Sequence, residues 1–274
     1  MQGRIQRWTP AGILGLWLGL VVMAPWLNLQ PDHIELSKIL AIPDSTAWLG
    51  YDDLGRPLLD RLVAGAGTSL FVALWVVVIS ALIGTVIGAI GAYVGGVWDH
   101  LIVRIIDIFM AFPGILLAIA MAGLMGPGID NVIIALSTVG WVGFARLARA
   151  QVLSIKQRLH VTAAISLGAS HAAIVVRHIL PLAWAPLIVE ASFAVASVVI
   201  AEAGLSFLGL GVQPPEASWG SIIRDGTRYM LVAPHMVLVP GIALMLVVLA
   251  VNLLGDQLRD WADVRMPGKM PSLR

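Results

Sequence analysis

Long uncharged runs of apolar residues alternate with polar segments along this 274-residue chain. A helix needs about 20 apolar residues to cross a bilayer. The continuity of these runs is typical of helices, because the strands of a membrane barrel alternate in polarity. We therefore expect an all-α integral membrane protein with six transmembrane helices. The expected spans are residues 11–29, 68–94, 101–125, 131–147, 181–203 and 232–254.

Small residues and prolines add local expectations to this pattern. Gly84, Gly88 and Gly91 are spaced so that one face of the second span can pack closely against another helix. Pro113 is expected to kink the third span. Residues 204–230 are too polar and too rich in Pro and Gly to cross the bilayer, so we expect a re-entrant or surface-lying segment there.

The polar segment of residues 151–181 separates the fourth span from the fifth. Residues 161–173 are rich in Ala, contain no Pro and carry small polar side chains every four residues, which predicts a short helix outside the bilayer. Gly168 would allow a bend or a close approach there. Such a helix is too small to form a domain, so we expect a partner protein to bind it.

Lys and Arg side chains predict the orientation, because they are enriched on the cytoplasmic side of membrane proteins. With the N-terminus inside, twelve of the 17 Lys and Arg residues are cytoplasmic, and so are both termini and residues 151–181. A signal peptide is the alternative for the first span. The length of that span, its large residues and its lack of a small-residue cleavage site favour a retained helix. Arg104 and Asp107, three residues apart, are expected to pair near the interface.

The composition limits the classes of function. The chain has 59% hydrophobic and 12% charged residues, a composition suited to contact with membrane lipid. Its formal net charge of +1 gives no reason to expect nucleic acid as a partner. The absence of cysteine excludes disulfides and thiolate chemistry. We find no G-x-x-x-x-G-K-[ST] nucleotide loop and no H-E-x-x-H metal motif. We therefore expect no catalytic residue, cofactor or metal site in this chain.

Two carboxylic acids, Glu190 and Glu202, lie within the fifth span. An ionisable residue inside a span is a candidate functional residue, and the alternative for each is a hydrogen-bonded contact between helices. We expect Glu202 near the outer end of the span, where water or a partner helix can solvate it.

Residues 160–170 (HVTAAISLGAS), followed by residues 177–181 (RHILP), resemble the EAA loop of ABC importer permeases. More specifically, the chain is similar to the second (C-type) permease subunit of the dipeptide, oligopeptide and nickel importers. The resemblance extends over nearly all of residues 49–263. The other matching segments are residues 49–65 (LGYDDLGRPLLDRLVAG), 107–113 (DIFMAFP), 140–149 (GWVGFARLAR), 201–211 (AEAGLSFLGLG), 213–220 (QPPEASWG) and 252–260 (NLLGDQLRD).

The resemblance implies a type I ABC importer permease core in residues 49–263. Residues 1–48 then hold a cytoplasmic stub, the first span and the start of an outer loop, and residues 264–274 form a cytoplasmic tail. The resemblance also implies a sibling permease, two cytoplasmic ATPases that use ATP and Mg, and an extracytoplasmic substrate-binding protein, in the inner membrane of a prokaryote. The expected cargo is a di- or oligopeptide, moved by alternating access, and the alternative is nickel or a chelated metal.

The same resemblance assigns candidate site residues. The residues expected to contact an ATPase are Thr162, Ala163, Ala164, Leu167, Gly168, Ala169 and Ser170. Thr162 departs from the family, because it replaces the glutamate that gives the motif its name; threonine keeps the ability to cap a helix but loses the charge. Glu190, Glu202 and Phe207 are expected along the translocation path or at the interface between the permeases.

Two rival classes would leave different patterns. An ion-coupled secondary transporter that works alone would favour inverted repeats and several intramembrane carboxylates, whereas this chain offers Glu190 and no convincing repeat. A membrane-embedded enzyme would need a nucleophile or metal constellation, and the sequence contains none that we recognise.

Overall fold

The computed structural model describes residues 2–45 and 47–264 of the chain, so the tail expected at residues 264–274 falls almost wholly outside the described residues. The long helices are α1 (Gln2–Met23), α2 (Leu58–Val94), α5 (Ile129–Ile155), α8 (Leu180–Phe207) and α10 (His235–Val264). The shorter elements are α3 (Gly96–Met110), α4 (Gly114–Met125), α6 (Leu159–Ser166), α7 (His171–Ile174), α9 (Trp219–Thr227), the 3-10 turns η1 (Ala24–Trp26) and η2 (Leu36–Lys38), and a π-helical turn, η3 (Val175–Ile179).

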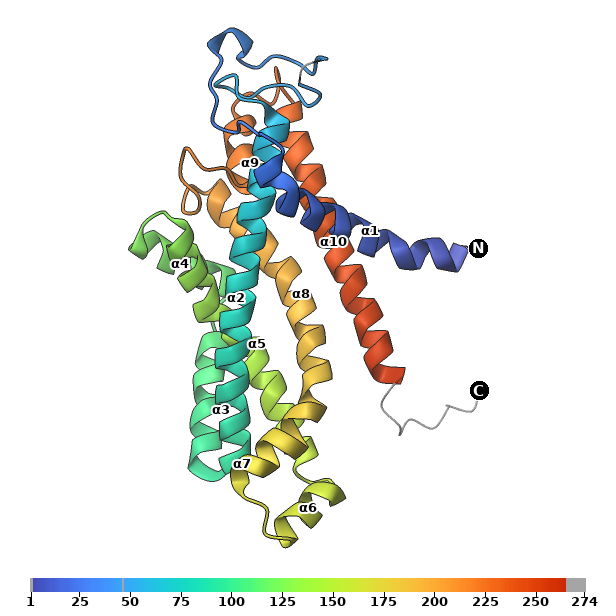
Figure 1. Ribbon diagram of the computed structural model, residues 1–274. Coiled ribbons are helices and arrows are strands. Elements are labelled where there is room, and N and C mark those ends of the chain that lie inside the picture. The colour runs from blue at the N-terminus through green and yellow to red at the C-terminus, as the bar shows by residue number, and fades with distance from the viewer. Residues whose placement is uncertain (1, 46, 265–274) are drawn as a thin grey trace.

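Five helical segments are long and apolar enough to cross a membrane, and the bent pair of α3 and α4 makes a sixth if it counts as one span. The prediction of an all-α, six-span membrane fold is confirmed in that form. Figure 1 shows α2, α5 and α8 running along the length of the molecule, with α1 crossing α10. The chain between α1 and α2 gathers at one end with α9, and α6 and α7 lie at the opposite end.

Glycines allow α2 and α5 to pack with their backbones in contact. A Cβ atom on Gly84 would overlap the carbonyl oxygen of Trp141, and one on Gly88 would overlap that of Ala145. Small residues permit such close approach between helices in a membrane. The glycine spacing seen in the sequence therefore marks the central seam of the fold.

The α2 helix begins ten residues earlier than the predicted second span. Pro57 stands at its N-cap, and no further proline interrupts the helix. Gly65 weakens this part of the helix in isolation, but it packs against Trp219, since a Cβ there would lie 3.1 Å from the indole Cδ1 atom. A tertiary contact thus extends the helix beyond its apolar run.

The third predicted span is broken, not merely kinked. The axes of α3 and α4 differ by 82° across the break at residues 111–113. Pro113 has no N–H to continue the helix and disfavours helical geometry in the residue before it. The chain therefore turns away and starts again at Gly114.

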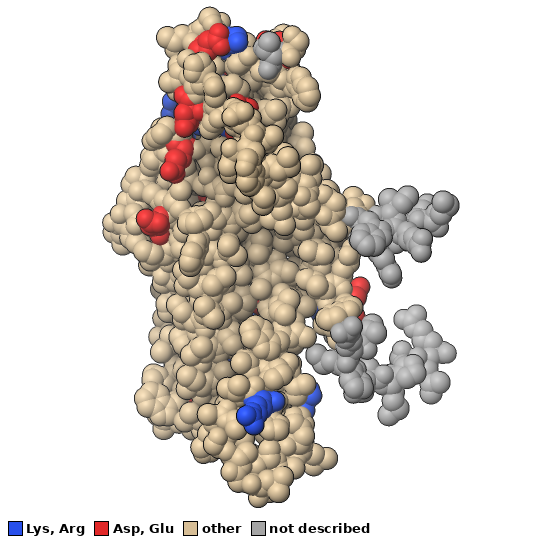
Figure 2. All heavy atoms as spheres, viewed as in Figure 1, with Lys and Arg blue, Asp and Glu red and all other residues tan. Residues whose placement is uncertain are grey.

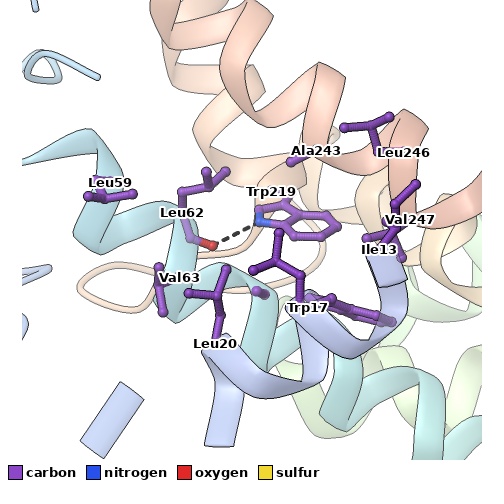
Figure 3. Close-up of a pocket in the computed structure, with 12 residues that line it drawn as sticks. Ile13, Trp17, Leu20, Leu59, Leu62, Val63, Trp219, Ala243, Leu246 and Val247 are labelled. Carbon is purple, nitrogen blue, oxygen red and sulfur yellow. Dashed lines mark hydrogen bonds between the residues drawn. The ribbon is translucent and has the colours of Figure 1, made fainter. Parts of the chain in front are cut away.

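Residues 204–230 fold partly into the bundle end, where residues 217–222 are buried, while residues 213–216 form an exposed loop. The α9 helix within them is fixed by a capping box in which Ser218 and Ser221 satisfy each other's backbone N–H groups. Trp219 is 2% exposed, and its indole N–H donates to the carbonyl oxygen of Leu62 at 2.9 Å. Figure 3 shows this bond beside an apolar cavity whose walls include Trp17 on α1 and Val247 on α10.

Charged side chains gather toward the two ends of the face shown in Figure 2. Asp and Glu cluster toward the end that carries the α1–α2 connection, together with some Lys and Arg, whereas Lys and Arg are the charged side chains seen near the α6–α7 end. The surface between these ends is largely uncharged, as a protein spanning a bilayer requires.

Candidate coupling surface and intramembrane carboxylates

The polar segment between α5 and α8 folds into two short helices, and the single helix expected over residues 161–173 is wrong. Gly168 breaks it with a φ of +79°, in the left-handed region. The Gly168 amide donates to the Ile165 carbonyl at 2.9 Å, and the Ala169 amide donates to the Ala164 carbonyl at 3.1 Å. This pair of bonds is the Schellman arrangement that ends a helix. Ser170 then starts α7 by accepting a hydrogen bond from the Ala173 amide at 3.3 Å.

Gly168 supplies a bend and makes no close contact with the described residues. A Cβ atom built on it would meet nothing within 4 Å. Its left-handed φ still favours glycine, because other L-residues are strained there. Of the two roles expected for Gly168, the structure selects the turn.

Thr162 does not cap the helix. Arg158 is the N-cap residue of α6 and provides no side-chain cap. The Thr162 hydroxyl instead donates back to the Arg158 carbonyl at 3.4 Å, and Ser166 does the same toward Thr162 at 3.0 Å. The missing carboxylate therefore has no substitute at the start of this helix.

One face of the α6–α7 segment packs against the rest of the subunit, and the other face is exposed. Val161 is 1% exposed and packs in a buried cluster with Ile155 and Ile174. By contrast, Leu159 and Leu167 are each 88% exposed. The residues assigned to ATPase contact divide in the same way. Thr162, Ala163, Leu167, Gly168 and Ser170 are exposed, whereas Ala164 and Ala169 are half-buried.

Three polar contacts tie the C-terminal end of α5 and the chain that follows it to the adjoining ends of α2 and α3. Arg149 binds Asp99 through two hydrogen bonds of 2.6 and 2.8 Å. The Lys156 ammonium donates to the Ala92 carbonyl at 2.8 Å. No local sequence pattern predicts these contacts. The ion pair predicted between Arg104 and Asp107 does not occur among the described residues, where Arg149 pairs with Asp99 instead.

The third contact is a hydrogen bond of 2.8 Å between the Tyr93 hydroxyl and Nδ1 of His171 at the start of α7. On the other side of α7, the helical path continues through η3 into α8, so residues 171–207 form one unbroken run. A displacement of α6 and α7 therefore reaches α8 with no loop between them.

Glu202 lies in the interior of the subunit, which corrects the expectation that water solvates it at the end of the span. It is 1% exposed. The Ser69 hydroxyl on α2 donates to one carboxylate oxygen at 3.0 Å, and the Ser206 hydroxyl donates to the other at 2.7 Å. Ser206 also accepts from the Val212 amide at 3.3 Å. This network joins α2, α8 and the chain that follows α8.

Glu190 and Phe207 occupy different surroundings from Glu202. Phe207 is 42% exposed at the C-terminal end of α8. Glu190 is half-buried beside α5, where a Cβ atom on Gly143 would lie 3.1 Å from its Oε1 atom. The structure thus separates the three residues, and their role in a translocation path stays a prediction.

The opposite end of the molecule is held by a buried ion network. The Asp52 carboxylate accepts from the Arg56 guanidinium at 2.6 Å, and the Arg61 guanidinium lies 3.3 Å from it. Asp52 also accepts from the Leu54 and Arg56 amides at 2.9 and 2.8 Å. These bonds fix the entry into α2.

Comparison with known proteins agrees with this architecture. Residues 80–267 match the family described as "Binding-protein-dependent transport system inner membrane component". The chain belongs to this family. Such a match, over more than half of the chain, makes it a permease subunit of an ABC importer, in a class whose ATPases are separate subunits.

Individual relatives support the same assignment. The chain is 44% identical over 262 residues to the glutathione transport system permease protein GsiD of Escherichia coli (strain 536), covering 95% of this chain and 86% of the relative. The protein of that name from Pectobacterium atrosepticum is 39% identical over 252 residues, covering 90% and 84%.

A solved structure shares the fold. One chain of the MetNI methionine ABC transporter, in an inward-facing conformation, superposes with a TM-score of 0.62 and 21% identity, covering 75% of this chain and 98% of that one. The type I ABC importer fold and the multi-pass membrane location predicted from the sequence are therefore confirmed.

Proposed function

We propose that this chain pairs with a sibling permease to form the membrane pathway of an importer for peptide-like solutes. The relatives described above are named for transport of glutathione, which is a small peptide. No three His, Asp or Glu residues in the described part of the chain come together as a metal-binding group, so the geometry gives no reason to prefer nickel as cargo.

The exposed surface of α6 and α7 is the observation that supports the proposal for energy coupling. Two leucines that are 88% exposed project from the polar end of a membrane protein, and exposed apolar side chains in such a patch favour contact with another protein. One of two cytoplasmic ATPases, which bind ATP and Mg, docks here. Closure of the ATPases on ATP displaces α6 and α7, and the unbroken run into α8 switches the pathway between inward- and outward-facing states.

The charge distribution supports the orientation. The α6–α7 end is cytoplasmic, both termini are cytoplasmic, and the α1–α2 connection faces outward, where an extracytoplasmic binding protein delivers cargo. Lys and Arg favour the cytoplasmic side. Figure 2 shows Lys and Arg near the α6–α7 end, whereas Asp and Glu predominate toward the end of the α1–α2 connection.

Copurification followed by reconstitution tests the proposal. An affinity-tagged chain extracted from its native membrane in mild detergent should carry a sibling permease and two ATPase subunits. In liposomes, the complex with its binding protein should take up labelled glutathione or trialanine only with ATP. A chain that isolates alone and transports these peptides with an ion gradient in place of ATP would instead be a secondary transporter.

A further inference from the structure

A half-polar cavity lies between α5, α8 and α10 on the α6–α7 half of the molecule. Its volume is about 440 Å³, which is in the range of sites for small molecules. Its walls carry a carboxylate, a guanidinium and an amide, from Glu190 on α8, Arg259 on α10 and Gln151 on α5. Apolar surface from Leu147, Val189 and Phe193 completes the walls.

The local packing keeps this cavity open. Close to it, α8 and α10 are in contact, because a Cβ on Gly255 would lie 2.8 Å from the Ser192 hydroxyl. Toward the α6–α7 end the two helices separate (Figure 1). On the other wall, Gly143 leaves the space that the Glu190 carboxylate occupies, since a Cβ there would be 3.1 Å from Oε1.

None of the three polar groups has a partner inside the described chain. Glu190, Arg259 and Gln151 form no hydrogen bond or ion pair with any described residue. Charged groups within a membrane protein are costly unless they are paired or face a polar cavity. This contrasts with Glu202, further along α8, whose two oxygens both accept hydrogen bonds from serines.

We infer that this cavity binds cargo in transit by its two charged ends, with Glu190 accepting an ammonium group and Arg259 donating to a carboxylate. Gln151 offers an amide for a peptide bond between them. A peptide with free termini carries both charges and fits the half-apolar walls. The inference rests on the proposed function and adds a cargo site within this subunit and a requirement for a zwitterionic solute.

A direct binding measurement on the membrane complex tests the site, because the substrate-binding protein is left out and cannot select the peptide. The reconstituted complex of both permeases and the ATPases is placed in nanodiscs of phosphatidylglycerol and dialysed against labelled trialanine, N-acetyl-trialanine or trialanine amide. Trialanine should bind the wild-type complex. Glu190→Gln and Arg259→Gln should each weaken its binding about tenfold or more, because each loses a charge-assisted hydrogen bond.

The blocked peptides separate the two charges. N-acetyl-trialanine lacks the ammonium and should bind wild type and Glu190→Gln equally weakly, while trialanine amide should do the same for Arg259→Gln. Asp256→Asn, an exposed carboxylate on α10 outside the cavity, is the matched control and should bind trialanine as wild type does. Equal trialanine binding by all four proteins, or none by wild type, would overturn the inference.

Two further measurements complete the test. One distinguishes a cargo site from a lipid site, and the other distinguishes failure of this inference from failure of the proposed function. A lipid headgroup with an ammonium and a phosphate has similar chemistry, so loss of trialanine binding when phosphatidylethanolamine is added would assign the cavity to lipid instead. ATP-driven uptake of trialanine is measured on the same preparations with the binding protein. Uptake by wild type without any effect of the variants on binding would reject this site and leave the proposed function standing, whereas no uptake by wild type would reject the proposed function itself.

Discussion

Arg149 on α5 holds Asp99 near the start of α3 through two hydrogen bonds of 2.6 and 2.8 Å. The pair is partly exposed, with 30% of the Arg149 side chain and 16% of the Asp99 side chain accessible. It holds the C-terminal part of α5, which leads into the proposed coupling surface, against the start of α3. The pair therefore acts on the position of α6 and α7 without touching them.

Arg149→Lys should loosen this attachment, because lysine cannot form the two-pronged bond. The expected loss of stability is about 1 kcal/mol, together with more ATP hydrolysed per peptide imported. Arg146→Lys is the matched control, since the Arg146 guanidinium forms no ion pair with the described residues and donates to the Met110 sulfur at 3.7 Å. Combining Arg149→Lys with Asp99→Asn should add little to either change alone. Additive losses would show that the two residues act separately.

Gly168→Ala should impair coupling while leaving the subunit in the membrane. The left-handed φ of +79° strains an alanine by about 1–2 kcal/mol, and the turn that ends α6 then shifts. Gly96→Ala is the control, because Gly96 also has a positive φ of +59° and open space around it, at the α2–α3 turn. We expect peptide uptake to fall for Gly168→Ala and to stay near wild type for Gly96→Ala. Equal uptake by both variants would argue against docking at this turn.

Glu202 is expected to serve structure and not the transport path. Glu202→Leu leaves the buried hydroxyls of Ser69 and Ser206 without their acceptor, which costs about 1–3 kcal/mol for each unsatisfied group. Glu202→Gln keeps the shape and an acceptor oxygen, so it should be less destabilising. Thermal aggregation in detergent ranks the variants, and Glu216→Gln on an exposed loop controls for loss of a carboxylate. Stable Glu202→Gln protein with abolished uptake would restore the path role.

Asp53 should make the connection between α1 and α2 less stable at neutral pH than at mildly acidic pH. Burial, and then the negative charges of Asp52 and Asp225, raise the pKa of Asp53 above its ordinary value of 3.8. The folded state thus holds this proton more tightly than the unfolded state does, and stability falls as the pH rises through the raised pKa.

Asp53→Asn removes that ionisation. The variant should unfold at a higher temperature than wild type at pH 7, and the difference should shrink as the pH is lowered and disappear below the ordinary pKa of 3.8. Asp130→Asn, at an exposed carboxylate, is the control. A variant less stable than wild type at pH 7 would mean that the 3.8 Å approach of Asp53 to Arg56 outweighs the burial.

The sequence predicts what depends on neighbouring residues and misses what depends on distant ones. Apolar runs located the spans, and the Gly84 and Gly88 spacing located the α2–α5 seam. The ion pair of Arg149 joins residues 50 positions apart and the bond of Glu202 to Ser69 spans 133 positions, so neither has a local pattern. Glu202 looked solvated because Ser69, its partner on α2, is too distant in the sequence to be recognised.

The break between α6 and α7 was readable in principle. Gly168 followed by Ser170 is a helix stop followed by an N-cap residue. The surrounding alanines, which favour a continuous helix, outweighed that signal in our prediction. The extension of α2 to Leu58 is the reverse case, since packing of Trp219 on Gly65 supports a helix that the local glycines disfavour.

The π-helical turn between α7 and α8 has a consequence for the tolerance of this subunit to insertions and deletions. Each residue of an α-helix turns the chain by about 100°, and the run from His171 to Phe207 contains no loop that could absorb a change in length. A π-turn (i→i+5) holds about one residue more than an α-turn (i→i+4), so deleting one residue within Val175–Ile179 would let a regular α-helix form there with little rotation of α6 and α7. Deleting one residue from the α-helical part of the run would instead rotate α6 and α7 by about 100° around the α8 axis and turn the proposed docking face away. We therefore expect the π-helical turn to tolerate a one-residue deletion better than α8 does.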